Sequence, residues 1–161
     1  MRSKCIALAF FAALVPSMAG AQQASPPYGA AISFTAAKKA MAAAEALAMK
    51  NGWPMAIVIL DSGGNIVMTE RMDRAGLASI HVAEGKARLS VQFRASSKRF
   101  ADLMASGQGS VLLSIPGIIA AEGGEVLISD GQVVGAIGVS GGAPNQDSET
   151  ARAAVATLEK K

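Results

Sequence analysis

Two side chains able to bind a metal stand three residues apart in the middle of the chain. His81 and Glu84 share one face of a helix if this segment is helical, because residues i and i+3 are neighbours on a helix surface. An imidazole nitrogen with a carboxylate oxygen is a borderline donor set that iron, zinc or copper accepts. Arg88 follows four residues after Glu84, so an ordinary surface ion pair beside a solvated histidine is the competing interpretation. Because two ligands do not make a closed metal site, spacing alone favours the ion pair.

Residues 138–142 match the G-x-S-x-G pattern of a serine nucleophile placed between a strand and a helix. The single histidine precedes Ser140, whereas the hydrolase fold with that motif places its histidine after the serine. We therefore interpret the glycines as a strand exit where two backbones approach closely. Glycines at a helix start can also form an anion-binding nest, although no G-K-[ST] sequence supports a phosphate loop. Glu122 and Glu125 form a second carboxylate pair around two glycines, which we interpret as a turn.

Eight predicted elements position these residues. Thr35 can cap the first helix, Gly52 ends it as a left-handed stop, and Asp130-Gly131 is typical of a tight hairpin turn. Either Ser96 or Ser97 caps the third helix. The order is helix, strand, strand, helix, helix, strand, strand, helix, over residues 35–51, 55–60, 66–72, 78–93, 97–107, 125–129, 132–140 and 144–161. Because hairpins rather than crossovers join the strands, we expect an antiparallel α+β domain.

Composition limits the function classes. The chain has 161 residues, of which 51% are hydrophobic and 17% charged, so it is not a disordered segment and fits a single domain. Aromatic residues make up 4% of the chain, which argues against a stacking surface for single-stranded nucleic acid. The formal charge of +3 includes Arg2 and Lys4, which belong to an N-terminal targeting pattern. A nucleic-acid partner therefore has little support.

That N-terminal pattern predicts a secretory signal peptide over residues 1–21. Basic residues precede an apolar run over residues 5–15, which is too short to span a bilayer as a helix. Ala19-Gly20-Ala21 then matches an A-x-A cleavage site. Cys5 would leave with the signal, so we expect a periplasmic or secreted protein with no disulfide and no stable membrane anchor. Residues 22–32 would form a flexible tail and residues 33–161 the domain.

Several segments together resemble the GlcG/HbpS-like family, the DUF336-type haem-binding domain also found at the C-terminus of PduO. They include the glycine-rich residues 131–142 with the sequence GQVVGAIGVSGG, and also residues 58–65, 71–73, 85–87, 146–147 and 151–154. The resemblance covers about residues 33–158 in order. It implies a profilin-like antiparallel sheet flanked by helices, a homo-oligomer and, in some secreted members, haem and iron binding.

The resemblance also implies where a site would lie. In a secreted haem-binding member an E-x-x-E iron motif precedes the Lys-Ala of the second helix, and His81 and Glu84 stand at the corresponding positions. Some members carry a histidine just before the first helix, where residues 33–35 here read Ser-Phe-Thr. The family proline after the first glycine pair is replaced by Glu125. Besides the metal pair, the cofactor-binding candidates are Lys86, Arg88, Gly123, Gly124, Gly141 and Gly142.

Two functions from different classes remain open. The first is an exported, oligomeric binding module whose ligand is haem, another tetrapyrrole or iron. The second is an enzyme of haem breakdown or of small hydroxy-acid or corrinoid metabolism. General acid–base catalysis would depend on one histidine and on carboxylates with no evident partner, which favours the binding module. Bound iron with open coordination positions can nevertheless react with oxygen.

The signal-peptide prediction can be checked by N-terminal sequencing of protein recovered from the periplasm or the medium. We expect the mature chain to begin at Gln22, because Ala19 and Ala21 are the small residues that signal peptidase requires. The variant Ala21→Tyr should accumulate unprocessed. Exported protein that retains Met1 would contradict the prediction.

Overall fold

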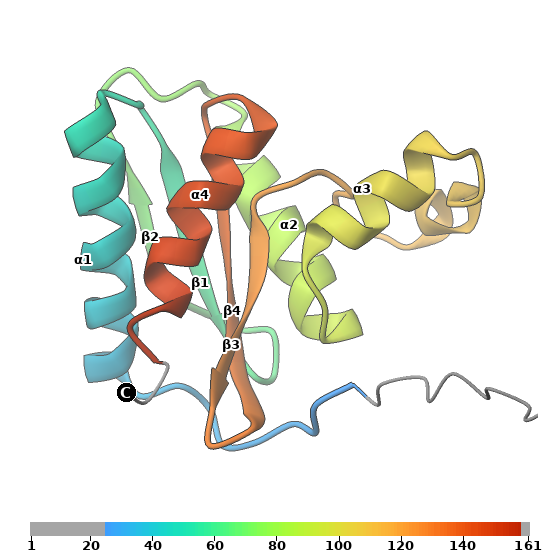
Figure 1. Ribbon diagram of the computed structural model, residues 1–161, viewed down its shortest axis with the longest axis horizontal. Helices are drawn as coiled ribbons and strands as arrows, with labels where there is room; N and C mark the ends of the chain where they lie inside the picture. The colour runs from blue at the N-terminus through green and yellow to red at the C-terminus, as the bar shows by residue number, and fades with distance from the viewer. Residues whose placement is uncertain (1–24, 159–161) are drawn as a thin grey trace, which may run out of the picture.

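The computed structural model describes residues 25–158, so the predicted signal peptide lies outside the described residues. The elements are α1 (Phe34–Asn51), β1 (Ala56–Asp61), β2 (Ile66–Arg71), α2 (Ser79–Phe93), α3 (Ser97–Ala105), the short 3-10 helix η1 (Ser110–Ser114), β3 (Gly124–Ser129), β4 (Gln132–Ser140) and α4 (Pro144–Val155). The strands form one antiparallel sheet in the order β2-β1-β4-β3 (Figure 1). The α+β prediction is confirmed, and η1 is an addition that the sequence did not indicate.

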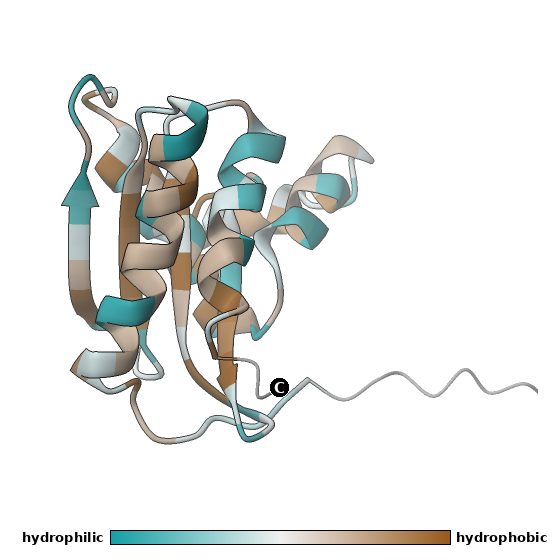
Figure 2. Ribbon diagram, turned by 60° about the vertical axis from the view of Figure 1, so that its left-hand side comes forward, coloured by the Kyte–Doolittle hydropathy of each residue, from teal (hydrophilic) through white to brown (hydrophobic). Residues whose placement is uncertain are grey.

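Helices cover both faces of the sheet. Helices α1 and α4 lie side by side on one face, and α2 packs against β4 and β1 on the other (Figure 1). In β1, Ile57 and Ile59 join the cluster beneath α1 and α4, whereas Val58 and Leu60 join the cluster beneath α2. This burial on both faces explains the unbroken apolar run of the strand. Figure 2 shows hydrophobic residues concentrated in the inner strands and hydrophilic residues in parts of the helices, in turns and at the end of the edge strand.

Local signals set most of the element boundaries. The Ser33 hydroxyl accepts a hydrogen bond from the Ala36 amide at 3.2 Å, so α1 begins at Phe34. The predicted cap, Thr35, instead lies within the first turn of the helix. Gly52 ends α1 with a φ of +67°. Asp130 and Gly131 both have positive φ, +51° and +74°, as a tight hairpin turn requires. Among residues 25–158, no helix is both long and apolar enough to cross a membrane.

One glycine of β4, Gly138, lets α2 lie directly on the sheet. A Cβ atom at Gly138 would collide with the Ala83 carbonyl oxygen of α2. The small residues Ala83 and Ala87 face this point and are fully buried. This close approach of two backbones is the role that we predicted for the glycine-rich segment.

The residues before α1 run along β4. The Val133 amide donates to the Pro27 carbonyl at 2.8 Å, and the Ile32 amide donates to the Val134 carbonyl at 2.8 Å. The Tyr28 hydroxyl also donates to the Val91 carbonyl at 2.7 Å. Part of the segment predicted as a flexible tail is therefore hydrogen-bonded to the domain. The sequence could not indicate this, because the partners lie far along the chain.

One oppositely charged pair lies inside the protein. Lys86 Nζ on α2 donates to Asp147 Oδ2 on α4 at 2.7 Å, and the two side chains are 3% and 5% exposed. The ammonium also donates to the Val139 carbonyl of β4 at 2.9 Å, and Asp147 Oδ1 accepts the Gly142 amide at 3.0 Å. Burial raises the pKa of Asp147, against the opposing effects of the Lys86 ammonium and the Gly142 amide. The pair joins the helices on opposite faces of the sheet.

We expect Asp147→Leu to lower the free energy of unfolding by about 3–5 kcal/mol, because Lys86 then remains buried without its counter-charge. Lys86→Met should lower the free energy of unfolding by a similar amount. The double variant Lys86→Met/Asp147→Leu should recover most of the loss, because neither buried charge remains. Urea denaturation of the four proteins measures the coupling between the two sites. If the double variant loses as much free energy of unfolding as the two single variants together, this account is wrong.

Candidate functional site

The predicted metal pair lies on the outer face of α2. His81 is exposed, while Glu84 and Arg88 are half-buried. Together with Gly85 and residues 117–119, which follow η1, they line a cavity of about 330 Å³. The helix therefore brings the three side chains to one side, as their spacing predicts.

Glu84 and Arg88 form an ion pair across one helical turn. Arg88 Nη2 and Nε both donate to Glu84 Oε1, at 2.6 and 2.9 Å. Arg88 Nη1 also reaches the Gly64 carbonyl at 3.4 Å. The surface ion pair, which was the alternative to a metal site, is therefore present between Glu84 and Arg88. Within residues 25–158, Glu84 Oε2 and the His81 imidazole have no hydrogen-bond partner, so each can still bind a ligand.

The donor set is small. No group of three or more His, Cys, Asp or Glu side chains in the described part of the chain is placed to hold a metal ion. A free iron ion at His81 and Glu84 would need further ligands from water or a second subunit. Haem iron is held by its porphyrin and needs only an axial side chain, which one histidine can supply. The residues present therefore fit haem better than free iron.

The rest of this cavity suits a flat apolar ligand with acidic groups. Ile118 and Ile119 form an apolar wall, and the Ile119 amide donates to the Gly85 carbonyl at 3.1 Å. A Cβ at Gly85 would lie 2.6 Å from Ile119 Cγ1, so a glycine is needed for this wall to approach α2. The Arg88 guanidinium stands on the same cavity and can pair with a carboxylate.

The other predicted cofactor-binding residues lie away from this cavity. Lys86 points into the interior, and a Cβ at Gly123 would lie 2.7 Å from Asp147 Cβ and 3.1 Å from Lys86 Nζ. Gly124 packs on the Lys86 backbone, Gly141 packs on the Pro54 carbonyl, and Gly142 donates to Asp147. The structure thus places these glycines at or near the buried ion pair. Their assignment to a cofactor stays a prediction.

The carboxylates around the first glycine pair belong to a polar network. Glu122 accepts from Lys98 Nζ and from the Ser148 hydroxyl, both at 3.3 Å. Glu125 lies in β3 and accepts from the Ser96 hydroxyl at 3.0 Å. Burial raises the pKa of Glu125, although the Ser96 hydrogen bond and the Arg152 charge oppose the shift. These partners come from distant elements, which is why the sequence suggested only a turn.

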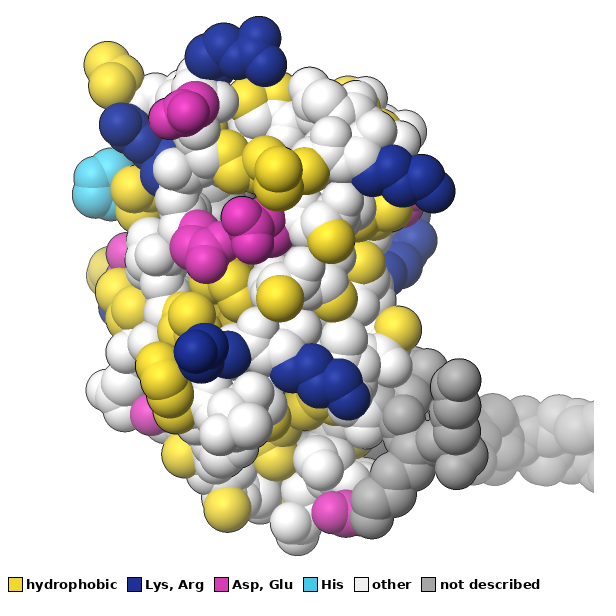
Figure 3. Space-filling view, turned by 90° about the vertical axis from the view of Figure 1, so that its left-hand side faces the viewer, with side chains coloured by type: hydrophobic (Ala, Val, Ile, Leu, Met, Phe, Trp, Pro, Cys, Tyr) yellow, Lys and Arg dark blue, Asp and Glu magenta, His cyan; other side chains and the backbone are white. Residues whose placement is uncertain are grey.

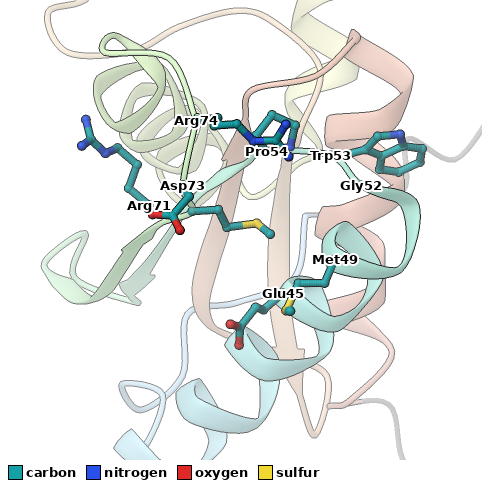
Figure 4. A pocket seen from close by; sticks show the side chains of 9 residues that line it. Glu45, Met49, Gly52, Trp53, Pro54, Arg71, Asp73 and Arg74 are labelled. Atoms are coloured by element: carbon teal, nitrogen blue, oxygen red, sulfur yellow. The ribbon is translucent and has the colours of Figure 1, made fainter.

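A second cavity, of about 570 Å³, was not predicted from the sequence. It lies between the end of α1, the start of β1 and the end of β2 (Figure 4). None of the site residues predicted from the sequence lines it. The signal that could have indicated it is Trp53, the only tryptophan in the chain.

Comparisons with known proteins identify the family. The family described as "Haem degrading protein HbpS-like" matches residues 32–156. The chain is 33% identical to the protein GlcG of Escherichia coli (strain K12) over 100 residues, which are 62% of this chain and 74% of that protein.

Solved structures agree. A double mutant of HbpS from Streptomyces reticuli superimposes with a TM-score of 0.76 at 30% identity, covering 96% of this chain and 100% of that chain. A structure described as the PduOC:Heme complex superimposes with a TM-score of 0.74 at 29% identity, covering 80% of this chain and 95% of that chain. The family match over residues 32–156 and the shared fold lead to one conclusion. The chain belongs to the HbpS-like family.

Proposed function

We propose that the protein is an exported, homo-oligomeric haem-binding module in which His81 would hold the haem iron. The observation that carries the proposal is the exposed imidazole of His81 beside an apolar wall and the Arg88 guanidinium. A relative of similar fold forms a haem complex, which supports the same ligand class here. The signal-peptide pattern supports function in the periplasm or outside the cell.

Haem bound at this face would supply an iron centre whose properties depend on its axial ligand. His81 would donate a ring nitrogen to that iron. Arg88 would exchange part of its contact with Glu84 for a haem propionate, since both partners are carboxylates. Glu84 Oε2 would provide a second, weaker contact for iron without porphyrin.

Hemin titration of the mature protein tests the proposed role of His81. We expect a saturable Soret shift with the parent and at least tenfold weaker binding with His81→Ala, because no second histidine can replace the ligand. Adding imidazole to His81→Ala should restore the Soret band. Glu84→Ala should retain hemin binding but lose iron binding.

Gln92→Ala is the matched control, because Gln92 is exposed on the same helix and does not line the His81 cavity. This variant should bind hemin like the parent. If His81→Ala and Glu84→Ala both bind hemin and iron with the affinity and stoichiometry of the parent, the proposal is wrong. The two side chains would then be ordinary solvent-exposed residues of α2.

The proposed assembly is supported by apolar side chains on the surface. Helix α3 and the segment after it project from the body of the domain (Figure 1). Val111 and Leu113 on η1 are 67% and 77% exposed, and a second copy of the chain could cover them.

We expect light scattering to give a mass of several subunits at micromolar concentration. Val111→Glu/Leu113→Glu should reduce that mass, because charges cannot be buried in an apolar contact without cost. Lys50→Glu, on the exposed end of α1, serves as a charge-changing control. A monomeric parent would contradict the proposed assembly.

A further inference from the structure

The second cavity shares no residue with the cavity at His81. Its walls come from three elements: the last turns of α1, the Trp53-Pro54 segment that leads into β1, and the residues that leave β2 (Figure 4). With about 570 Å³ it has room for a small organic molecule. The side chains on these walls indicate which class of molecule that would be.

Charges of both signs line this cavity without partners. Of the arginines in the described part of the chain, Arg71 and Arg74 are the two with no carboxylate, carbonyl or aromatic ring as partner. Glu45 and Asp73 likewise form no ion pair or side-chain hydrogen bond within residues 25–158. Arg74, Glu45 and Asp73 are thus free to contact a ligand. The Arg71 guanidinium points away from the other lining side chains in Figure 4.

The backbone of Arg74 is held in a conformation that favours glycine. Its φ is +69°, and the Ala75 amide donates to the Met72 carbonyl at 3.1 Å across a four-residue turn. At the third position of such a turn, a positive φ normally selects glycine or asparagine. A long cationic side chain at this position lowers stability, and backbone strain of this kind gathers at binding sites. The strained turn brings the Arg74 guanidinium to the cavity (Figure 4).

Trp53 adds an aromatic surface. The left-handed Gly52 turns the chain after α1, and the Trp53 amide donates to the Ala48 carbonyl at 2.9 Å. The half-buried indole packs partly against the core and also lines the cavity. In Figure 4 the indole lies on the side of the cavity away from Glu45 and Asp73, so its role here is to report on the cavity by fluorescence.

We propose that this cavity binds a small zwitterion, with its carboxylate on Arg74 and its ammonium group facing Glu45 and Asp73. Arg74 and Glu45 come from different elements and stand on different sides of the cavity, so a short apolar spacer between the two charges fits best (Figure 4).

Ligands of a single charge sign fit this cavity less well. A dianion would be repelled by Glu45 and Asp73. Glu45 also has a second carboxylate close by, since burial and then the charge of Glu45 raise the pKa of Glu70. Figure 3 shows acidic side chains next to one another on the face turned toward the viewer. A dication would be repelled by Arg74. A neutral apolar ligand would remove charged groups from water without replacing their hydration.

Tryptophan fluorescence provides a clean readout, because Trp53 is the only tryptophan in the chain. The probes are 5-aminovalerate, valerate and pentylamine, which share a five-carbon chain and carry both charges, only the negative charge or only the positive charge. We expect saturable binding of 5-aminovalerate at least about tenfold tighter than either other probe, as loss of one charge-assisted contact implies. Equal affinity for valerate, or no saturable change with any probe, overturns the proposal.

Substitutions separate binding from a structural role. Arg74→Gly should abolish 5-aminovalerate binding and raise the Tm by about 2–4 °C, because glycine relieves the positive φ. Glu45→Gln should weaken 5-aminovalerate binding and strengthen valerate binding. Arg99→Gln, on an exposed arginine of α3, is the matched control and should bind like the parent.

Arg74→Gly should bind hemin like the parent. The zwitterion proposal and the haem proposal can therefore fail independently of each other. Unchanged affinity for 5-aminovalerate in Arg74→Gly, whatever its stability, overturns the proposal.

Discussion

The buried ion pair between Lys86 and Asp147 fixes how the helices on the two faces sit on the sheet. A buried ion pair is weak evidence for stability, because desolvation offsets much of the attraction, but it penalises any arrangement that separates the charges. A slide or rotation of α2 would remove Lys86 from both Asp147 and the Val139 carbonyl. The pair therefore fixes the position and rotation of α2 relative to β4 and α4.

That fixed rotation also sets which face of α2 meets solvent. At about 100° per residue, His81 lies about 140° around the helix from Lys86, and Glu84 and Arg88 each lie about 160° around it. Holding Lys86 inward therefore turns all three side chains outward. The glycines support the same geometry, since Gly138 lets α2 approach β4 and Gly85 lets Ile119 approach α2. The proposed haem face is thus a consequence of packing on the opposite side of the same helix.

Much of the fold could be predicted from the sequence because its signals are local. The hairpin at Asp130-Gly131, the stop at Gly52 and the apolar run of β1 each depend on neighbouring residues. The pairing of residues 27–32 with β4 and the helix η1 depend on contacts that no short pattern encodes.

In the candidate site, too, local spacing was informative and contacts between distant segments could not be predicted. Helical spacing placed His81, Glu84 and Arg88 on one face, and the ion pair that we weighed against a metal is present between Glu84 and Arg88. Spacing could not show that Lys86 pairs with a carboxylate 61 residues away, and the family resemblance left Lys86 among the cofactor-binding candidates. The cavity at Arg74 was missed for a similar reason, because its walls come from three separate segments.

The most direct test of the central claim is an NMR measurement on His81, since isotope-labelled histidine gives a single ring signal. Gallium protoporphyrin IX, a diamagnetic substitute for haem, shifts the ring protons of an axial imidazole strongly upfield through its ring current. The account predicts this upfield shift in the mature protein, saturating with porphyrin. Stoichiometric uptake of the porphyrin with the His81 signal unmoved would contradict the assignment of His81 as the haem ligand.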